Sequence, residues 1–268
     1  MSSESGFFED RDRPDDMNGI ERTMPRGLQV QPTAISKDLA KNARGFKDKY
    51  VSVFKVFVHK TEPNFSSPWQ MKSQRQSIGT AFAIEGQRLL TNAHVVSYAS
   101  QVLVRRHGEA KRYIAKIISV AHDSDLALLS VPDPEFWNKG IEPLELEDEA
   151  PHLQDAVTVI GYPSGGENLS ITAGVVSRVD VWNYAHSGRR MLCIQIDAAI
   201  NSGNSGGPIV NYNGEAVGIV TSKMVGLGIE GLGFGISMPS ALESLGVEIK
   251  SQHLMPNSTL TACGNLIL

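Results

Sequence analysis

The sequence predicts an all-β protein built from two consecutive groups of short strands. Apolar and β-branched runs of about four to eight residues recur between positions 50 and 237, and Gly, Pro, Asn or Asp bounds each run. The 25 glycines suit a chain with many tight turns. Almost no helical periodicity separates the runs. This pattern indicates either two β-barrels or a β-sandwich.

Each half of the expected fold contains about six strands. In the first half, residues 46–150, strands are expected at 50–58, 78–84, 88–91, 101–105, 113–120 and 126–131, with a long loop at 60–77. In the second half, residues 151–248, strands are expected at 156–161, 171–179, 191–196, 208–210, 215–221 and 233–237. A helix is expected to begin at Pro239 and to end before Gly246, because proline suits a first turn and glycine a helix end.

The two ends of the chain lack this pattern. Residues 1–45 are polar, with acidic and basic residues mixed, and we expect a flexible tail there. Residues 249–268 are expected to be irregular. The N-terminus has no basic and apolar regions of a secretory signal, is too acidic for a transit peptide, and no stretch is apolar enough to span a membrane. We therefore expect a soluble, intracellular protein, without assigning a compartment.

Charge and cysteine content narrow the function classes. The formal net charge is −4 at pH 7 and no Lys/Arg block occurs, so a nucleic-acid partner is not expected. The chain has two cysteines, and Cys193 lies in an apolar run where a buried free thiol is the default interpretation. A bridge to Cys263 stays open as an alternative. So few cysteines favour a reducing compartment or a family that does without disulfides.

Three segments carry the residue types of acyl-transfer chemistry. They are LLTNAHVV at 89–96, HDSDLALL at 122–129 and DAAINSGNSGGP at 197–208. The reaction needs a nucleophile, a base, a group that holds the base, and donors for the oxyanion. Ser205 between glycines, His94 after an apolar strand and Asp125 before a buried strand supply the first three. Their order along the chain is that of chymotrypsin-type proteases, not of subtilisin or the α/β-hydrolases.

The residues alone leave one choice open. Asp123 competes with Asp125 as the acid, because residues two apart on a strand face the same way and periodicity does not separate them. The remaining histidines are interpreted as surface or structurally satisfied residues; they are His59, His107, His122, His152, His186 and His253.

The same segments carry a resemblance to a known family. TNAHVV at 91–96, DLAL at 125–128 and the serine motif at 197–208 resemble the HtrA/Deg serine proteases, and GYPSGGEN at 161–168 is similar to the plant-type Deg branch. The resemblance covers about residues 50–245. It implies a chymotrypsin-like double six-stranded β-barrel with a C-terminal helix, a serine endopeptidase that needs no cofactor or metal, and a homotrimer or a multiple of it.

The resemblance also implies roles for single residues. Ser205 attacks the scissile carbonyl, His94 takes its proton, and Asp125, favoured over Asp123, holds the imidazole. The backbone amides of Gly203 and Ser205 form the oxyanion hole. The substrates it implies are unfolded or damaged polypeptides cleaved without ATP, in protein quality control. The alternative is a latent or inactive protease that acts as a polypeptide-binding holdase or scaffold.

Specificity is argued from the pocket of this fold. Its base lies six residues before the nucleophile, at Ala199, where trypsin has an aspartate. Ala199 and Ile200 bring no charge, so cleavage after small or medium aliphatic residues is expected. Substrate is expected to pair as an added strand with Ile219, Val220, Thr221 and Ser222. An ordinary barrel strand is equally compatible with these four residues.

The sequence departs from related enzymes in two ways. Asn204 precedes the nucleophile where digestive zymogens have an activating aspartate, so activation by N-terminal cleavage is not expected. The family instead orders loops around the site, which here would be 60–77, 163–170, 180–190, 197–204 and 223–232. Family members also carry PDZ domains after the protease, and only some 20 residues follow the expected helix here.

Overall fold

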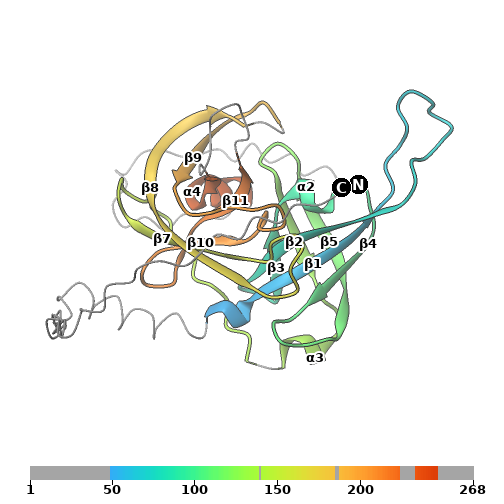
Figure 1. Ribbon diagram of the computed structural model, residues 1–268, viewed down its shortest axis with the longest axis horizontal. Coiled ribbons are helices and arrows are strands. Elements are labelled where there is room, and N and C mark those ends of the chain that lie inside the picture. Colours follow the sequence, from blue (N-terminus) through green and yellow to red (C-terminus); the bar gives the residue numbers. More distant parts are fainter. Residues whose placement is uncertain (1–48, 139, 185–186, 224–232, 247–268) are drawn as a thin grey trace, which may run out of the picture. The chain divides into compact units, whose positions relative to one another are not determined.

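The computed structural model describes residues 49–138, 140–184, 187–223 and 233–246, which belong to one compact unit of the chain. They form two closed antiparallel β-barrels of six strands each (Figure 1). The predicted double barrel is therefore confirmed, and the alternative of a sandwich is wrong. The expected tails at 1–45 and 249–268 lie outside the described residues, and the domain boundaries at 46, 150 and 248 stay predictions.

The first barrel has the strand order β1-β2-β3-β6-β5-β4. Its elements are η1 (Lys49–Ser52), β1 (Val53–Lys60), β2 (Arg75–Ile84), β3 (Arg88–Thr91), α2 (Ala93–Val96), β4 (Ala99–Arg105), β5 (Arg112–Ala121), β6 (Leu126–Ser130) and α3 (Pro134–Trp137). Buried aliphatic and aromatic side chains such as Phe54, Leu89 and Val104 fill it. The strands alternate inward and outward residues, and the inward side chains fill this small barrel, so its interior is a packed core rather than a channel.

The second barrel has the order β10-β11-β12-β9-β8-β7. Its elements are β7 (Ala156–Gly161), β8 (Ser170–Asn183), β9 (Arg190–Ile196), β10 (Pro208–Val210), β11 (Ala216–Lys223), β12 (Gly233–Ser237) and α4 (Met238–Ser244). Helix α4 packs against β11 and β12. Cys193 on β9 is a buried free thiol, as expected, and burial raises its pKa to about 11.

All twelve expected strands are present, and their ends differ most where pairing extends them. Strand β2 begins at Arg75, inside the expected 60–77 loop, because it pairs with β1 as far as Lys60. Strand β8 continues to Asn183, which pairs with Arg190 of β9. The β2 extension is polar, and the β8 extension mixes Asp180 and Asn183 with Val181 and Trp182, so hydrophobic periodicity gave no clear sign of either end. Ladder hydrogen bonds to a neighbouring strand decide such ends.

The barrels share one apolar cluster. It contains Phe82 and Leu90 from the first barrel and Tyr162 and Ile219 from the second. Strands β1 and β2 of the first barrel lie against β7 of the second. This shared core brings the end of β3 close to the loop before β10, where the sequence placed its candidate site.

Candidate active site

His94 lies on the short helix α2, directly after β3. Its backbone N–H donates to Oδ1 of Asp125 at 2.7 Å, and its ring Nδ1 lies 2.6 Å from Oδ2 of the same carboxylate. The imidazole is 26% exposed, whereas the carboxylate is buried. A buried carboxylate at this distance from Nδ1 fixes the ring orientation and leaves Nε2 as the ring's remaining basic nitrogen.

Asp125 ends the turn that leads into β6, with a left-handed φ of +52°. Its carbonyl oxygen accepts the Ala93 N–H at 3.1 Å and the Asn92 side-chain amide at 3.0 Å. Burial opposes ionisation of the carboxyl, but the hydrogen bond and charge of His94 and the hydroxyl of Tyr184 outweigh it. Together they hold the pKa of Asp125 below its usual value.

The turn places the two aspartates differently. Asp123 is exposed to solvent, whereas Asp125 is 1% exposed and faces His94. The expectation that both face the same way is wrong, because residues 122–125 form a turn rather than a strand. The positive φ of Asp125 directs its side chain away from the strand alternation on which that argument relied.

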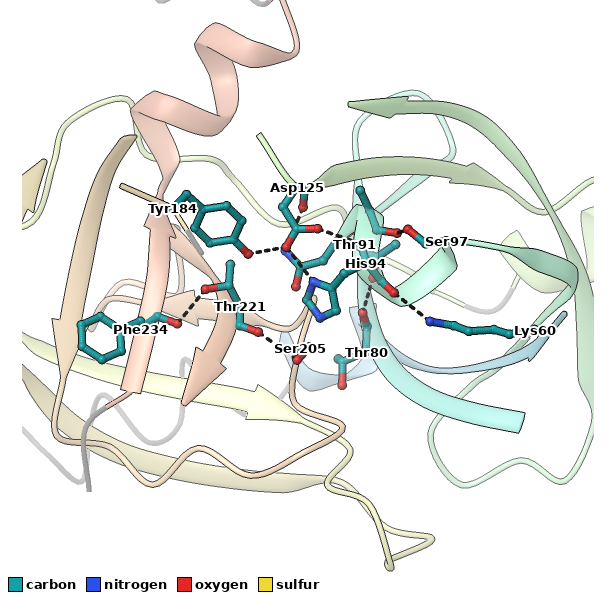
Figure 2. A network of polar contacts seen from close by, with 12 residues as sticks. Lys60, Thr80, Thr91, His94, Ser97, Asp125, Tyr184, Ser205, Thr221 and Phe234 are labelled. Carbon is teal, nitrogen blue, oxygen red and sulfur yellow. Dashed lines mark hydrogen bonds and ion pairs between the residues drawn. The ribbon is translucent and has the colours of Figure 1, made fainter. Parts of the chain in front are cut away.

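Ser205 lies in the loop between β9 and β10, and we call residues 201–207 the serine loop. Its hydroxyl donates to the carbonyl oxygen of Thr221 at 3.1 Å. In the view of Figure 2 the ring of His94 lies between Asp125 and Ser205. The neighbouring Gly206 has a φ of +83°, and a Cβ there would overlap the Thr80 carbonyl and the Thr91 hydroxyl. The serine loop thus lies directly against the end of β3, beside the histidine.

The serine loop depends on a second glycine and on Thr80. Gly203 has a φ of +98°, and a Cβ would overlap the backbone carbonyl of Tyr162. Buried Thr80, on β2, donates its hydroxyl to the Gly203 carbonyl at 2.8 Å and accepts the Tyr162 N–H at 3.0 Å. Its own N–H donates to the Ser205 carbonyl at 2.9 Å. One residue of the first barrel therefore holds the serine loop at two points, through its hydroxyl and its backbone N–H.

The loop after β7, residues 162–168, forms the other support of the serine loop. The Ser164 N–H donates to the Ser202 carbonyl at 2.5 Å. The outer end of this loop is attached to the first barrel, since Lys55 Nζ donates to the Gly166 carbonyl at 2.7 Å. Glu167 pairs with Arg105 at 2.7 Å and, more distantly, with Lys55 at 3.6 Å.

The residues expected to bind substrate fall into two groups. Ile219 and Val220 are fully buried between β10 and β12, and both backbone groups of Val220 are bonded to the serine loop. Of these four residues, Thr221 and Ser222 lie on the part of β11 whose one neighbouring strand, in the described ranges, is β12. Ala199 is exposed and its carbonyl accepts the Thr172 hydroxyl at 2.9 Å. Ile200 is buried and packs against Gly233.

The expected oxyanion donors are two backbone amides that are available to a ligand. In the part of the chain that the structure describes, the amides of Gly203 and Ser205 donate to no protein acceptor. A backbone N–H without an internal acceptor needs water or a ligand. Within the same residues, no three His, Cys, Asp or Glu side chains gather closely enough to hold a metal ion.

Two residues at the site were missed by sequence reasoning. Tyr184 donates its hydroxyl to Oδ2 of Asp125 (Figure 2), and Thr80 holds the serine loop. Tyr184 is the one aromatic residue in the polar stretch 183–190, which is a weak signal for burial. Thr80 sits in an ordinary strand pattern, and nothing in the sequence around it marks the contact.

Two six-stranded barrels with a buried aspartate–histidine pair beside a glycine-flanked serine define a trypsin-like peptidase domain. A family model described as a trypsin-like peptidase domain matches residues 79–219, more than half of the chain. None of the helices in the described ranges is long and apolar enough to cross a membrane.

Known proteins narrow the class. The chain is 52% identical over 168 residues to "Protease Do-like 2, chloroplastic" of Arabidopsis thaliana, covering 63% of this chain and 27% of that protein. It is 44% identical over 174 residues to "Serine protease DegP homolog" of Plasmodium falciparum, covering 65% and 20%. The structure of "HtrA-type protease AlgW with decapeptide" aligns with a TM-score of 0.63 and 26% identity, over 76% of this chain and 66% of that one.

The chain belongs to the HtrA/Deg family of trypsin-like proteases, as its motifs indicated. It spans less than a third of the length of these two relatives.

Proposed function

We propose that this chain is a serine endopeptidase that cleaves unfolded or damaged polypeptides without ATP, in protein quality control. One observation carries the proposal: the buried Asp125 carboxylate lies 2.6 Å from the His94 ring beside the loop that bears Ser205. Family membership supports the same reaction. The substrate class follows from the resemblance alone, and mapped digestion products test it.

In the proposed reaction His94 takes the proton of Ser205 as the hydroxyl attacks the peptide carbonyl. Asp125 keeps the ring in the tautomer that presents Nε2 to the serine and stabilises the cation that forms. The ring then returns the proton to the leaving amine. Because Ser205 Oγ donates to the Thr221 carbonyl in the structure, its proton must turn toward the ring before attack.

The oxyanion donors in this proposal are the amides of Gly203 and Ser205. Neither amide donates to an acceptor among the described residues, which supports the assignment, since a substrate oxyanion would supply one. The left-handed Gly203 and the Thr80 hydroxyl hold the peptide group between Gly203 and Asn204.

The proposed substrate contacts are narrower than the sequence suggested. Thr221 and Ser222 are the part of the predicted strand with an edge available to an extended peptide. Buried Ile200 beside Gly233 supports a shallow, uncharged primary pocket. We therefore keep the proposal of cleavage after small or medium aliphatic residues, with Ala199 near the pocket.

Digestion of a naturally unfolded protein such as casein tests the function. The wild type is expected to cut it and Ser205→Ala to lose at least ~10⁴-fold of that rate. Ser244→Ala is the matched control, because that hydroxyl bonds within α4 to Ser240. Equal digestion by the wild type and Ser205→Ala would refute the nucleophile. Frequent cuts after Lys or Arg would refute the pocket assignment alone.

A second candidate is a latent protease that acts as a polypeptide holdase or scaffold. The hydrogen bond from Ser205 to Thr221 favours such a resting state, because it directs the serine proton to a carbonyl oxygen. A fluorophosphonate probe separates the two. Labelling that disappears in Ser205→Ala supports the enzyme, whereas no labelling with or without unfolded protein supports the scaffold.

Assembly and location belong to the same proposal. We expect a homotrimer or a multiple of it, with Phe7, Phe8 and Phe46 as packing residues; all three lie outside the described residues. Sedimentation analysis of the full chain tests this assembly, and a monomer would contradict it. A soluble intracellular location is tested by cell fractionation.

A further inference from the structure

Tyr184 joins the second barrel to the acid of the first. It directly follows β8, is 5% exposed, and donates its hydroxyl to Oδ2 of Asp125. The same oxygen faces His94 Nδ1, while Oδ1 accepts the His94 N–H. Figure 2 shows Tyr184 and His94 on different sides of the carboxylate. Within the described ranges the two carboxylate oxygens therefore have three donors, and one of these comes from the other barrel.

The burial of Asp125 makes this third donor consequential. The carboxylate is almost inaccessible, so water does not readily replace the tyrosine hydroxyl if it is removed. A buried ionised oxygen that loses a donor is costly, and hydrogen bonds to ionised groups are the strong ones. Burial, followed by the charge of Asp125, raises the pKa of Tyr184, so its hydroxyl stays protonated and donates.

The β8–β9 turn determines where that hydroxyl lies. The Tyr184 N–H donates to the Arg189 carbonyl at 2.8 Å, and its own carbonyl accepts the Gly188 N–H at 2.7 Å. The Tyr184 backbone is thus fixed at the base of the turn, on the opposite barrel from His94 and Asp125.

Resting on the proposed function, we infer that Tyr184 is a positioning residue for catalysis: through its hydroxyl the β8–β9 turn orients the Asp125 carboxylate against His94. It also shares the negative charge of that carboxylate. Without this donor, Asp125 holds the protonated imidazole more strongly, so activity is expected to begin at a higher pH.

The charged and titratable groups around this pair are few in the described part of the chain. His94 faces Asp125 from α2, and Lys60 of β1 interacts with its charge while donating to the His94 carbonyl at 2.8 Å. Cys193 of β9 faces Tyr184 and stays a neutral thiol at neutral pH, because burial raises its pKa to about 11. Burial lowers the pKa of Lys60, whereas Cys193 keeps its charge state across the pH range of the test below.

The test compares Tyr184→Phe with Tyr113→Phe in the full chain. Tyr113 is also buried and its hydroxyl lies 3.5 Å from a carboxylate, that of Glu109, in the first barrel. Peptide cleavage is measured from about pH 5 to 9. For Tyr184→Phe we expect a roughly threefold to tenfold lower kcat, an unchanged KM and an acid limb of kcat/KM at higher pH. Tyr113→Phe should change none of these.

Other results would overturn the inference. An unchanged acid limb in Tyr184→Phe, or the same change in Tyr113→Phe, shows a merely structural role. If Tyr184→Phe does not fold, 3-fluorotyrosine at position 184, a stronger donor of nearly the same shape, should move the acid limb to lower pH, and no movement refutes the inference.

A further readout needs no substrate. The low-field proton resonance of the His94 Nδ1–H should shift between wild type and Tyr184→Phe, and a constant resonance overturns the inference. A wild type without proteolytic activity would refute the proposed function and still leave this readout decisive for Tyr184.

Discussion

The two barrels contribute to the site by different physical means. In the first barrel, short polar contacts hold His94 against the ionised, buried carboxylate of Asp125. In the second, Ser205 is held by close backbone approach, since Gly203 and Gly206 lie where any Cβ would overlap neighbouring atoms. The proposed base is therefore positioned by electrostatics, and the proposed nucleophile by steric fit.

Because of this difference, the serine loop can change conformation more easily than the contact between His94 and Asp125. A buried carboxylate bonded to its donors has few alternative arrangements at low cost, because breaking those hydrogen bonds leaves an uncompensated charge. A glycine-rich loop has several accessible backbone conformations, and here its neighbours select one of them. Those neighbours are Thr80, across the barrel junction, and the loop 162–168.

The largest effect on kcat is expected when the electrostatic contact between Asp125 and His94 is broken. Asp125→Asn keeps the shape of the side chain but removes the charge and favours the wrong tautomer of His94, so kcat should fall by about 10⁴-fold. Asp123→Asn is the matched control, because that side chain is exposed and two residues away. Steady-state cleavage of a peptide substrate measures both. Equal losses in the two variants would contradict the assignment of the acid.

The next largest effect on kcat is expected when the steric fit of the serine loop is broken. Gly203→Ala forces a Cβ onto the Tyr162 carbonyl and should displace the proposed oxyanion donor, with a loss of roughly 10²–10³-fold in kcat. Gly108→Ala has a similar positive φ of +73° but open space around it, so it carries the backbone strain without the overlap. Should Gly108→Ala lose as much activity, general destabilisation rather than loop position is the cause.

A smaller effect on kcat is expected when the contact of Thr80 with the serine loop, which joins the two barrels, is removed. Thr80→Val keeps the shape but leaves the buried Gly203 carbonyl without its hydroxyl donor, which costs about 1–3 kcal/mol. We expect roughly a tenfold lower kcat with an unchanged KM, and recovery of most of the rate in Thr80→Ser. Kinetics and thermal unfolding of both variants measure this. A serine variant as impaired as the valine variant would contradict this role of the hydroxyl, because serine retains it.

The smallest effect concerns the outer attachment of the loop 162–168. The Glu167 side chain is 69% exposed, so water and salt screen its pairs with Arg105 and Lys55. Glu167→Gln should lower kcat by no more than about threefold at low salt and by less at high salt. Glu149→Gln, an exposed carboxylate before the second barrel, is the control. A large, salt-independent loss would show that this exposed pair holds the loop more firmly than screening allows.

The sequence by itself determined the strands, the double barrel and the three segments of the site. Apolar runs record which residues are buried, and the His94, Asp125 and Ser205 motifs each lie within a few neighbouring positions. Residue periodicity left Asp123 and Asp125 open and the family resemblance favoured Asp125; the tertiary structure adds the physical difference, because the left-handed turn at Asp125 breaks the strand alternation. It alone brought Thr80 to Gly203 and Tyr184 to Asp125. These contacts join residues 123 and 59 positions apart, and local sequence patterns carry no information about hydrogen bonds over such separations.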